Sequence, residues 1–293
     1  MTRRTRRRIA LAFLGLAALA AGIPLYARYI EPAWLRLDAR DVWLEKANPS
    51  APIVVLHLSD FHASRYVSYS HIARAVAMGL RQKPDLICLT GDYIVRLIAE
   101  RDRYKAILSQ LSAAAPTFAC LGNHDGGRWA ESYGGNARLT DIIGLLKESG
   151  ITCLVNESAT VTVRGQPIRI VGLGDLWAEM TRPADCLAAR NKGDGMPVIV
   201  LSHNPDSKTM LSGYEWDVML CGHSHGGQLS LPFLGTPFAP LGDKQYAEGL
   251  HRWDGRWIYV TRGVGNLHGV RFNCRPQVSV IRLHGSSARE RKG

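Results

Sequence analysis

The sequence has no C-x-x-C pair, which is the spacing typical of zinc ribbons and redox motifs. Its six cysteines stand singly along the chain. Three of them, Cys88, Cys120 and Cys221, lie inside apolar runs, where a cysteine is typical of a small buried hydrophobic residue. The cysteines therefore predict no C-x-x-C chemistry, and they do not identify a redox compartment.

Acidic residues are absent from the first 30 positions, and this absence explains much of the net charge. The chain carries +11, and six early arginines account for six of these charges, which leaves +5 for the rest. They are Arg3, Arg4, Arg6, Arg7, Arg8 and Arg28. A stripe of basic and aromatic residues is also missing. We therefore expect no nucleic-acid partner.

An uncharged stretch at residues 9–27 directly follows the arginine cluster. At ~1.5 Å per residue it just spans a ~30 Å hydrocarbon core, so residues 1–28 are expected to be a membrane anchor or an export signal. Ala18-Leu19-Ala20 is a candidate cleavage site. The arginines predict a cytoplasmic N-terminus, which places the remainder of the chain outside.

The rest of the chain divides into a linker at 29–50, a globular domain at 51–284 and a basic tail at 285–293. The 46% hydrophobic content suits a substantial core. Within the domain, apolar runs alternate with helix-period stretches, which predicts an α/β fold with buried strands. The runs cover residues 53–58, 86–89, 117–121, 168–172, 198–201 and 216–221.

Polar side chains follow five of these runs. In chain order they are Asp60, His62, Asp92, Asn123, His124, Asp125, His203, His223 and His225. Because the carboxyl ends of strands line the ligand crevice of α/β sheets, we expect these loops to converge. Two carboxylates, one amide and four imidazoles are too many ligands for one tetrahedral ion. They suit two five- or six-coordinate ions, with manganese, iron or zinc favoured.

The motifs D-x-H, GD-x, GNHD, H-N and GH-x-HGG occur in this order between about residues 53 and 228. This set resembles the calcineurin-like metallophosphoesterase superfamily. The resemblance implies an α/β/β/α fold, in which a two-sheet sandwich is flanked by helices and carries its metals at the strand ends. Here one N-terminal transmembrane or signal helix would precede it.

The resemblance also implies a role for each motif residue. One metal would bind Asp60, His62, Asp92 and His225, and the other Asp92, Asn123, His203 and His223, with Asp92 bridging. His124 would contact the phosphate and protonate the leaving oxygen.

One position departs from the protein-phosphatase branch of the superfamily. That branch has a supporting Asp three residues after the bridging Asp, where this chain has Val95. A protein phosphatase is therefore disfavoured, and we expect Asp125 to orient His124. Arg96 matches an arginine of that branch, and a surface cation is the alternative interpretation.

The apolar segment 229–241 is interpreted either as core under a long loop or as a wall that receives an acyl chain. The superfamily includes membrane-associated enzymes that hydrolyse UDP-2,3-diacylglucosamine in lipid A synthesis. The resemblance thus implies a dinuclear hydrolase of phosphodiester or pyrophosphate bonds, which uses a metal-bridging hydroxide on a lipid-linked substrate.

Two alternatives remain for the side of the membrane on which the domain lies, and further alternatives remain for the functional class of the protein. The charge rule places the domain on the periplasmic side of a bacterial inner membrane, whereas a UDP-lipid substrate requires the cytoplasmic face. The alternatives to a lipid-directed hydrolase are a non-catalytic metal-containing phospholipid-binding protein and a nuclease-like phosphodiesterase.

Overall fold

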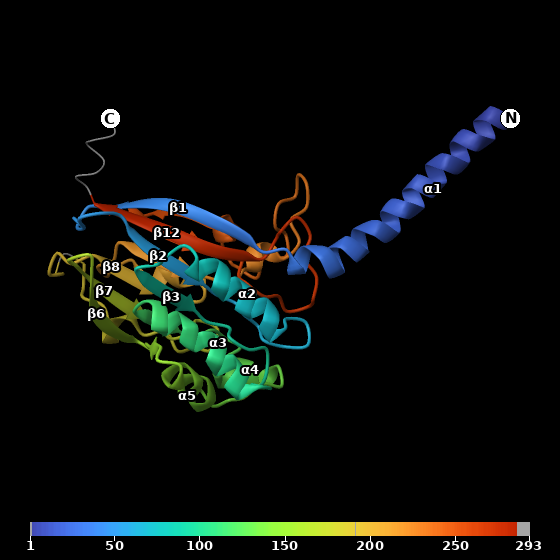
Figure 1. Cartoon of the computed structure of the whole chain (residues 1–293). Helices are drawn as coiled ribbons and strands as arrows, with labels where there is room; N and C mark the ends of the chain where they lie inside the picture. Colours follow the sequence, from blue (N-terminus) through green and yellow to red (C-terminus); the bar gives the residue numbers. More distant parts are fainter. Residues whose placement is uncertain (1, 191, 286–293) are drawn as a thin grey trace.

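Two six-stranded sheets pack face to face in this computed structural model, which describes residues 2–190 and 192–285 (Figure 1). Helices cover the outer face of the first sheet, and short 3₁₀ helices with loops cover the outer face of the second. The predicted two-sheet sandwich is confirmed. Residues 286–293 of the expected basic tail lie outside the described residues.

The first sheet is mixed and has the strand order β1-β12-β2-β3-β4-β5. Its strands β2 to β5 run parallel, β12 is antiparallel to β2, and β1 is parallel to β12. The strands are β1 (Arg36–Leu44), β2 (Ile53–Leu58), β3 (Leu86–Thr90), β4 (Thr117–Cys120), β5 (Thr152–Cys153) and β12 (Gln277–Gly285).

The second sheet has the order β10-β11-β9-β8-β7-β6. Its four central strands are parallel, and an antiparallel strand closes each edge. The strands are β6 (Glu157–Val163), β7 (Gln166–Gly172), β8 (Val198–Leu201), β9 (Val218–Cys221), β10 (Gly249–Trp253) and β11 (Arg256–Val260).

Apolar residues on both faces of each central strand explain the uninterrupted apolar runs. In β2, Val55 faces the layer between the sheets, while Leu56 and Leu58 face the helices. In β8, Ile199 and Val200 divide in the same way. Because successive side chains of a strand point to opposite faces, a strand buried on both sides is apolar throughout.

Four helices lie between the strands of the first sheet: α2 (Tyr69–Leu80), α3 (Arg101–Ala114), α4 (Gly127–Ser132) and α5 (Thr140–Glu148). The short 3₁₀ helices are η3 (Pro183–Asp185), η4 (Pro205–Leu211), η5 (His225–Gly227) and η6 (Lys244–Tyr246). In Figure 1, α2 and α3 lie against one face of the β2–β3 region, and α5 lies beyond α3, where it packs against β5. Ser68 caps α2 by accepting the backbone N–H of His71, which starts the helix where the apolar period begins.

The N-terminal segment is one continuous helical rod made of α1 (Arg3–Leu25), η1 (Tyr26–Ile30) and η2 (Glu31–Ala33). By length and composition it could cross a membrane, and none of its most apolar window is buried in the domain. In Figure 1 the rod points away from the sandwich. We call residues 26–33, at its domain end, the helix foot.

The linker prediction for residues 29–50 is wrong in its middle part. Residues 36–44 form β1, which pairs along its whole length with β12 at the edge of the first sheet. Sequence reasoning missed this strand because its first six residues include the charged residues Arg36, Asp38, Arg40 and Asp41, which interrupt any apolar pattern. The partner strand lies more than 230 residues away in the chain, so no local sequence pattern predicts the pairing.

Candidate metal centre

The ends of five parallel strands place the predicted ligands at one edge of the two facing sheets. β2 leads into Asp60 and His62, β3 into Asp92, and β4 into Asn123. β8 and β9, in the other sheet, lead into His203, His223 and His225. All seven side chains are buried, with exposed fractions of 5% or less. The structure therefore brings together every predicted metal ligand.

Five of these seven residues have a left-handed backbone conformation. The φ angles of Asp60, His62, Asp92, His223 and His225 lie between 45° and 68°. Side-chain-bearing residues adopt this region uncommonly and at a cost of about 1–3 kcal/mol each, and such residues cluster at functional sites. These strained backbone conformations orient the five side chains toward the interior of the site.

Two glycines allow the carboxylates to lie against the backbone. A Cβ on Gly222 would stand 2.1 Å from Oδ2 of Asp60, and one on Gly122 would stand 2.2 Å from Oδ1 of Asp92. Any larger residue would displace the carboxylates. Both carboxylates also accept backbone N–H groups, from His223 and from His124 respectively.

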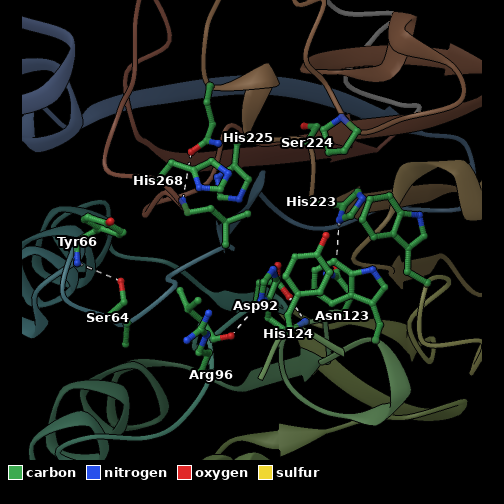
Figure 2. Close-up of a pocket in the computed structure, with 18 of the residues that line it drawn as sticks. Ser64, Tyr66, Asp92, Arg96, Asn123, His124, His223, Ser224, His225 and His268 are labelled. Atoms are coloured by element: carbon green, nitrogen blue, oxygen red, sulfur yellow. Dashed lines mark hydrogen bonds between the residues drawn. The ribbon is translucent and has the colours of Figure 1, made fainter. Parts of the chain in front are cut away.

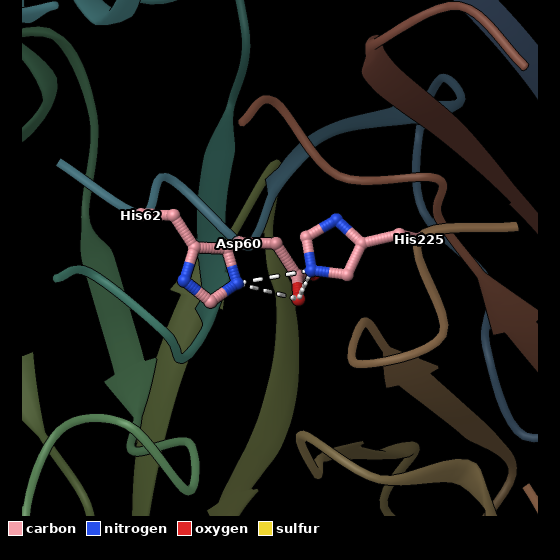
Figure 3. Close-up of side chains that lie close together, drawn as sticks. All are labelled: Asp60, His62 and His225. Atoms are coloured by element: carbon pink, nitrogen blue, oxygen red, sulfur yellow. Dashed lines mark hydrogen bonds and ion pairs between the residues drawn. The ribbon is translucent and has the colours of Figure 1, made fainter. Parts of the chain in front are cut away.

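Asp60, His62 and His225 form the first group of donors (Figure 3). Nε2 of His62 lies 3.0 Å from Nε2 of His225, and the latter lies 3.3 Å from Oδ1 of Asp60. Oδ2 of Asp92 lies 3.3 Å from Nε2 of His62. These donor atoms converge on one point, as metal ligands do.

The four residues predicted for the second metal, Asp92, Asn123, His203 and His223, are linked by close contacts. Oδ2 of Asp92 lies 3.1 Å from Nε2 of His203. Nδ1 of His223 lies 3.0 Å from Oδ1 of Asn123, as Figure 2 shows. Because the same oxygen of Asp92 lies near both His62 and His203, this carboxylate stands between the two predicted groups.

Burial sets the protonation of the imidazoles. It lowers the pKa of His62 and of His223 to about 3, and it lowers the pKa of His225 as well. Burial also opposes the charge of Asp92, but His203, His124 and His62 together hold the pKa of Asp92 well below its usual value. Burial also opposes the charge of His203, but Asp92, Asp60 and Asp175 together raise the pKa of His203 well above 6.5. The site therefore offers three neutral imidazoles and an ionised central carboxylate, and a cation bound beside Asp92 would displace the proton of His203.

The hydrogen bonds of the site fit divalent metals. Nε2 of His223 is buried and has no hydrogen-bond partner among the described residues, while its Nδ1 is held by Asn123. Nδ1 of His203 donates to the carbonyl of Thr90 at 2.6 Å, so Nε2 of His203 is the nitrogen that faces Asp92. A ligand histidine oriented through its other nitrogen is typical of metal sites.

The predicted contact between Asp125 and the ring of His124 is wrong. Nδ1 of His124 donates to the backbone carbonyl of Val95 at 3.0 Å. Asp125 accepts the backbone N–H groups of Asp92, Tyr93 and Gly122, each at 2.8 Å. Its carboxylate therefore fixes the two loops that present Asp92 and Asn123. The sequence carries no signal for a backbone carbonyl as the partner of His124.

The metal centre forms the floor of a cavity of about 830 Å³ (Figure 2). Trp129, Tyr133 and Trp177 line one side. The rings of Trp129 and Tyr133 stack at 4.1 Å, and Trp129 also packs edge-on against His124 at 4.5 Å. Sequence reasoning missed this aromatic wall, in which Trp129 and Tyr133 come from α4 and its C-terminal end and Trp177 comes from the loop after β7.

The cavity lining also includes Arg65, Arg96 and Phe238. The sequence left two interpretations of Arg96, a match to the protein-phosphatase branch and a surface cation. In the structure Arg96 is exposed and lines the cavity. The core interpretation of segment 229–241 is wrong for its middle part, because Phe233, Leu234 and Phe238 are exposed. Only Ala239 and Leu241 of this segment are buried.

Arg271 lies beneath the first group of donors and is fully buried. Its guanidinium donates to the backbone carbonyls of Gly265 and Arg262, and to that of Cys274 at 3.0 Å. One of its nitrogens lies 3.3 Å from Nδ1 of His225. Sequence reasoning missed this residue, which follows the recognised motifs by more than 40 positions.

The comparisons with known proteins agree with this geometry. The sequence model of the calcineurin-like phosphoesterase family matches residues 53–227. Phosphodiesterase YaeI of Escherichia coli (strain K12) is 42% identical, over 95% of this chain and 99% of that protein. UDP-2,3-diacylglucosamine pyrophosphatase LpxG of Chlamydia muridarum is 27% identical, over 88% of this chain and 92% of that protein. The uncharacterized metallophosphoesterase YkuE of Bacillus subtilis is 29% identical, over 94% of each.

Proposed function

The chain belongs to the calcineurin-like phosphoesterase family and is a metal-dependent phosphodiesterase, and from this premise we propose that it is a dinuclear hydrolase of a lipid-linked substrate. The bond cleaved is a phosphodiester or pyrophosphate. The observation that carries the proposal is the pair of donor groups that share Asp92 at the floor of the cavity.

In this proposal, Asp60, His62, Asp92 and His225 hold one divalent cation, and Asp92, Asn123, His203 and His223 hold the other. Manganese, iron and zinc all suit this mixture of oxygen and nitrogen donors. When bound, such a pair of cations lowers the pKa of a water molecule and neutralises charge on the phosphoryl group.

His124 acts on the substrate from the cavity wall. Its Nδ1 is held by the carbonyl of Val95, so Nε2 is the nitrogen left for the substrate. From there, Nε2 contacts the phosphoryl oxygens and delivers a proton to the leaving oxygen. The stacked rings of Trp129 and Tyr133 keep bulk water from this face of His124.

Two observations support a lipid-linked substrate. The cavity of about 830 Å³ has aromatic residues on one side and opens beside exposed apolar residues of segment 229–241. The chain also carries an apolar N-terminal helix that we propose as a membrane anchor. The relative LpxG is named as a pyrophosphatase of UDP-2,3-diacylglucosamine, which makes that lipid the first natural candidate to assay.

The anchor also bears on location. Five arginines precede it, which favours a bacterial inner-membrane protein whose domain lies on the periplasmic side. A UDP-lipid substrate would require the cytoplasmic face instead. Reporter fusions at the C-terminus, one active only in the periplasm and one only in the cytoplasm, distinguish these orientations.

The experiment uses the full chain in detergent, loaded in turn with manganese, zinc and iron. Hydrolysis of bis-p-nitrophenyl phosphate, of its monoester and of UDP-2,3-diacylglucosamine is followed beside metal content. The test variant is Asp92→Asn, and the matched control is Asp185→Asn, an exposed carboxylate that pairs with Arg182.

We expect two metals per chain and diester hydrolysis, both lost in Asp92→Asn and kept in Asp185→Asn. Two bound metals without turnover on any of the three substrates would favour a non-catalytic binding protein. Salt-sensitive binding of DNA with hydrolysis would favour the nuclease alternative. Diester turnover without hydrolysis of the UDP-lipid would exclude that lipid alone.

A further inference from the structure

Three large apolar side chains project from one loop beside the cavity. In segment 231–238, Phe233 is fully exposed, and Leu234 and Phe238 are 71% and 63% exposed. The surrounding segment 229–241 contains no charged residue. Single exposed apolar side chains are ordinary, but a cluster on one uncharged loop marks a contact surface. We call residues 231–238 the apolar loop.

The strand-like ends of the apolar loop are tied to residues 269–275. Ser230 donates its backbone N–H to the carbonyl of Phe272, and Phe272 donates to the carbonyl of Gln228, both at 2.9 Å. Leu229 and Phe272 form an isolated parallel bridge. The base of the apolar loop is therefore held in place by this neighbouring segment.

The helix foot is bound to the same segment from the other side. Arg271 donates its backbone N–H to the carbonyl of Ala27 at 2.9 Å, and Arg28 donates to the carbonyl of Gly269 at 3.0 Å. Glu31 is fully buried and accepts the backbone N–H groups of Asn273 and Cys274. The foot is thus part of the folded domain, and it fixes the direction in which α1 leaves.

These bonds place the apolar loop and α1 at the same end of the molecule. In Figure 1 the orange loops that follow β9 rise beside the blue helix where α1 meets the domain. A bilayer crossed by α1 would begin near the foot, and the apolar loop would lie at its surface.

Aromatic and basic side chains gather at the same end. The guanidinium of Arg28 lies over the rings of Tyr29 and Tyr66, at 5.2 and 5.3 Å. That of Arg275 lies 3.9 Å from the ring of Trp34, which is half exposed. Tyrosine and tryptophan beside arginine are typical of the headgroup region of membranes.

We propose that the apolar loop is a second membrane contact. Phe233 and Leu234 insert into the membrane leaflet that is nearer the globular domain. Phe238 lies on the same loop and lines the cavity, so the cavity mouth faces the lipid headgroups. A lipid substrate then reaches the metal centre without leaving the bilayer. This inference rests on the anchor named under the proposed function.

The test places a bimane fluorophore on single introduced cysteines in the full chain, reconstituted in vesicles of phosphatidylethanolamine and phosphatidylglycerol. Leu234→Cys probes the apolar loop. Phe13→Cys, on α1 and 69% exposed, reports the anchor. Thr160→Cys is the control on β6, at the edge of the second sheet. The chain without an added cysteine corrects for the six native thiols.

Lipids that carry a doxyl quencher on the acyl chain should quench the bimane at positions 13 and 234 and leave position 160 bright. Phe233→Cys repeats the loop measurement if Leu234→Cys folds poorly. If the label at position 13 is quenched but the label on the apolar loop is as bright as that at position 160, the proposed loop contact is wrong and the membrane anchor still stands. A bright label at both 13 and 234 would overturn both proposals.

Discussion

Nδ1 of His124 donates a hydrogen bond to the backbone carbonyl of Val95 at 3.0 Å. The carbonyl holds the ring without any side-chain contribution from position 95. His124 stands beside both donor groups and could be either a metal ligand or a proton donor. The metal content of a His124 variant distinguishes these two roles. We expect His124→Ala to keep both metals and to lower kcat by about 10²–10⁴-fold, the range typical of a lost proton donor.

Val95→Ala is the matched control for this measurement. It keeps the backbone carbonyl, so the rate and the metal content should stay near those of the unchanged chain. Loss of a metal from His124→Ala, or a full rate in that variant, would contradict the assigned role. Both quantities come from the same samples, by metal analysis and diester hydrolysis.

Asp125 acts on loop geometry rather than on the reacting atoms. Its carboxylate accepts three backbone N–H groups, and an amide at this position would turn an NH₂ toward at least one of these donors. We therefore expect Asp125→Asn to lower the free energy of unfolding by about 1–3 kcal/mol. Metal affinity should fall with it, because the loops that carry Asp92 and Asn123 shift.

Thermal unfolding and metal titration of Asp125→Asn check this prediction, beside Asp185→Asn on the surface. Unchanged stability together with a tenfold or larger loss of kcat would instead indicate a direct catalytic role for Asp125.

The convergence of the predicted ligands was predictable because it depends on position as well as residue type. Each of Asp60, Asp92, Asn123, His203 and His223 follows an apolar run, and the ends of parallel strands meet at one sheet edge. The two-sheet core was predictable for the related reason that strands buried on both faces are apolar throughout.

The features that the sequence did not predict are those without a local pattern. β1 has four charged residues among its first six and pairs with a strand at the other end of the chain. The support of His124 is a backbone carbonyl, which every residue possesses. Trp129 and Trp177 meet only in the folded chain, where their rings lie 5.6 Å apart.

His57 predicts a pH dependence of stability that is separate from the metal ligands. It is fully buried in β2, and its Nε2 lies 2.8 Å from the hydroxyl of Thr90. Burial lowers the pKa of His57 from 6.5 to about 3. Below pH 6.5 the unfolded chain binds a proton that the folded chain does not, so stability falls as the pH falls from 6.5 toward 3.

His57→Gln removes this titration. Between pH 6.5 and 5 the unchanged chain should lose about 2 kcal/mol through His57, at 1.36 kcal/mol per pH unit, and the variant should not. At pH 7.5 the variant should be about 1 kcal/mol less stable, because its contact with Thr90 is altered. Urea unfolding of both chains at several pH values gives the difference, and parallel curves would contradict the prediction.

Arg271 connects the helix foot to the first group of donors. Its backbone N–H bonds to Ala27, while its guanidinium donates to carbonyls of the 262–274 segment and lies 3.3 Å from Nδ1 of His225. Arg271→Lys keeps the charge, but one ammonium cannot reach acceptors spread over several loops. His225 should then lose its orientation, while His203 and His223 keep theirs.

We therefore expect Arg271→Lys to weaken metal binding at the Asp60, His62 and His225 position by about 10–100-fold, the range seen when the support of a ligand is lost. Binding at the second position should change little, so a titration with manganese should resolve one weakened and one unchanged dissociation constant. Arg275→Lys is the matched control, since this half-buried arginine donates to the carbonyls of Trp34 and Leu35, away from the donor groups. Equal weakening at both positions would mean that Arg271 supports the whole loop system rather than His225 itself.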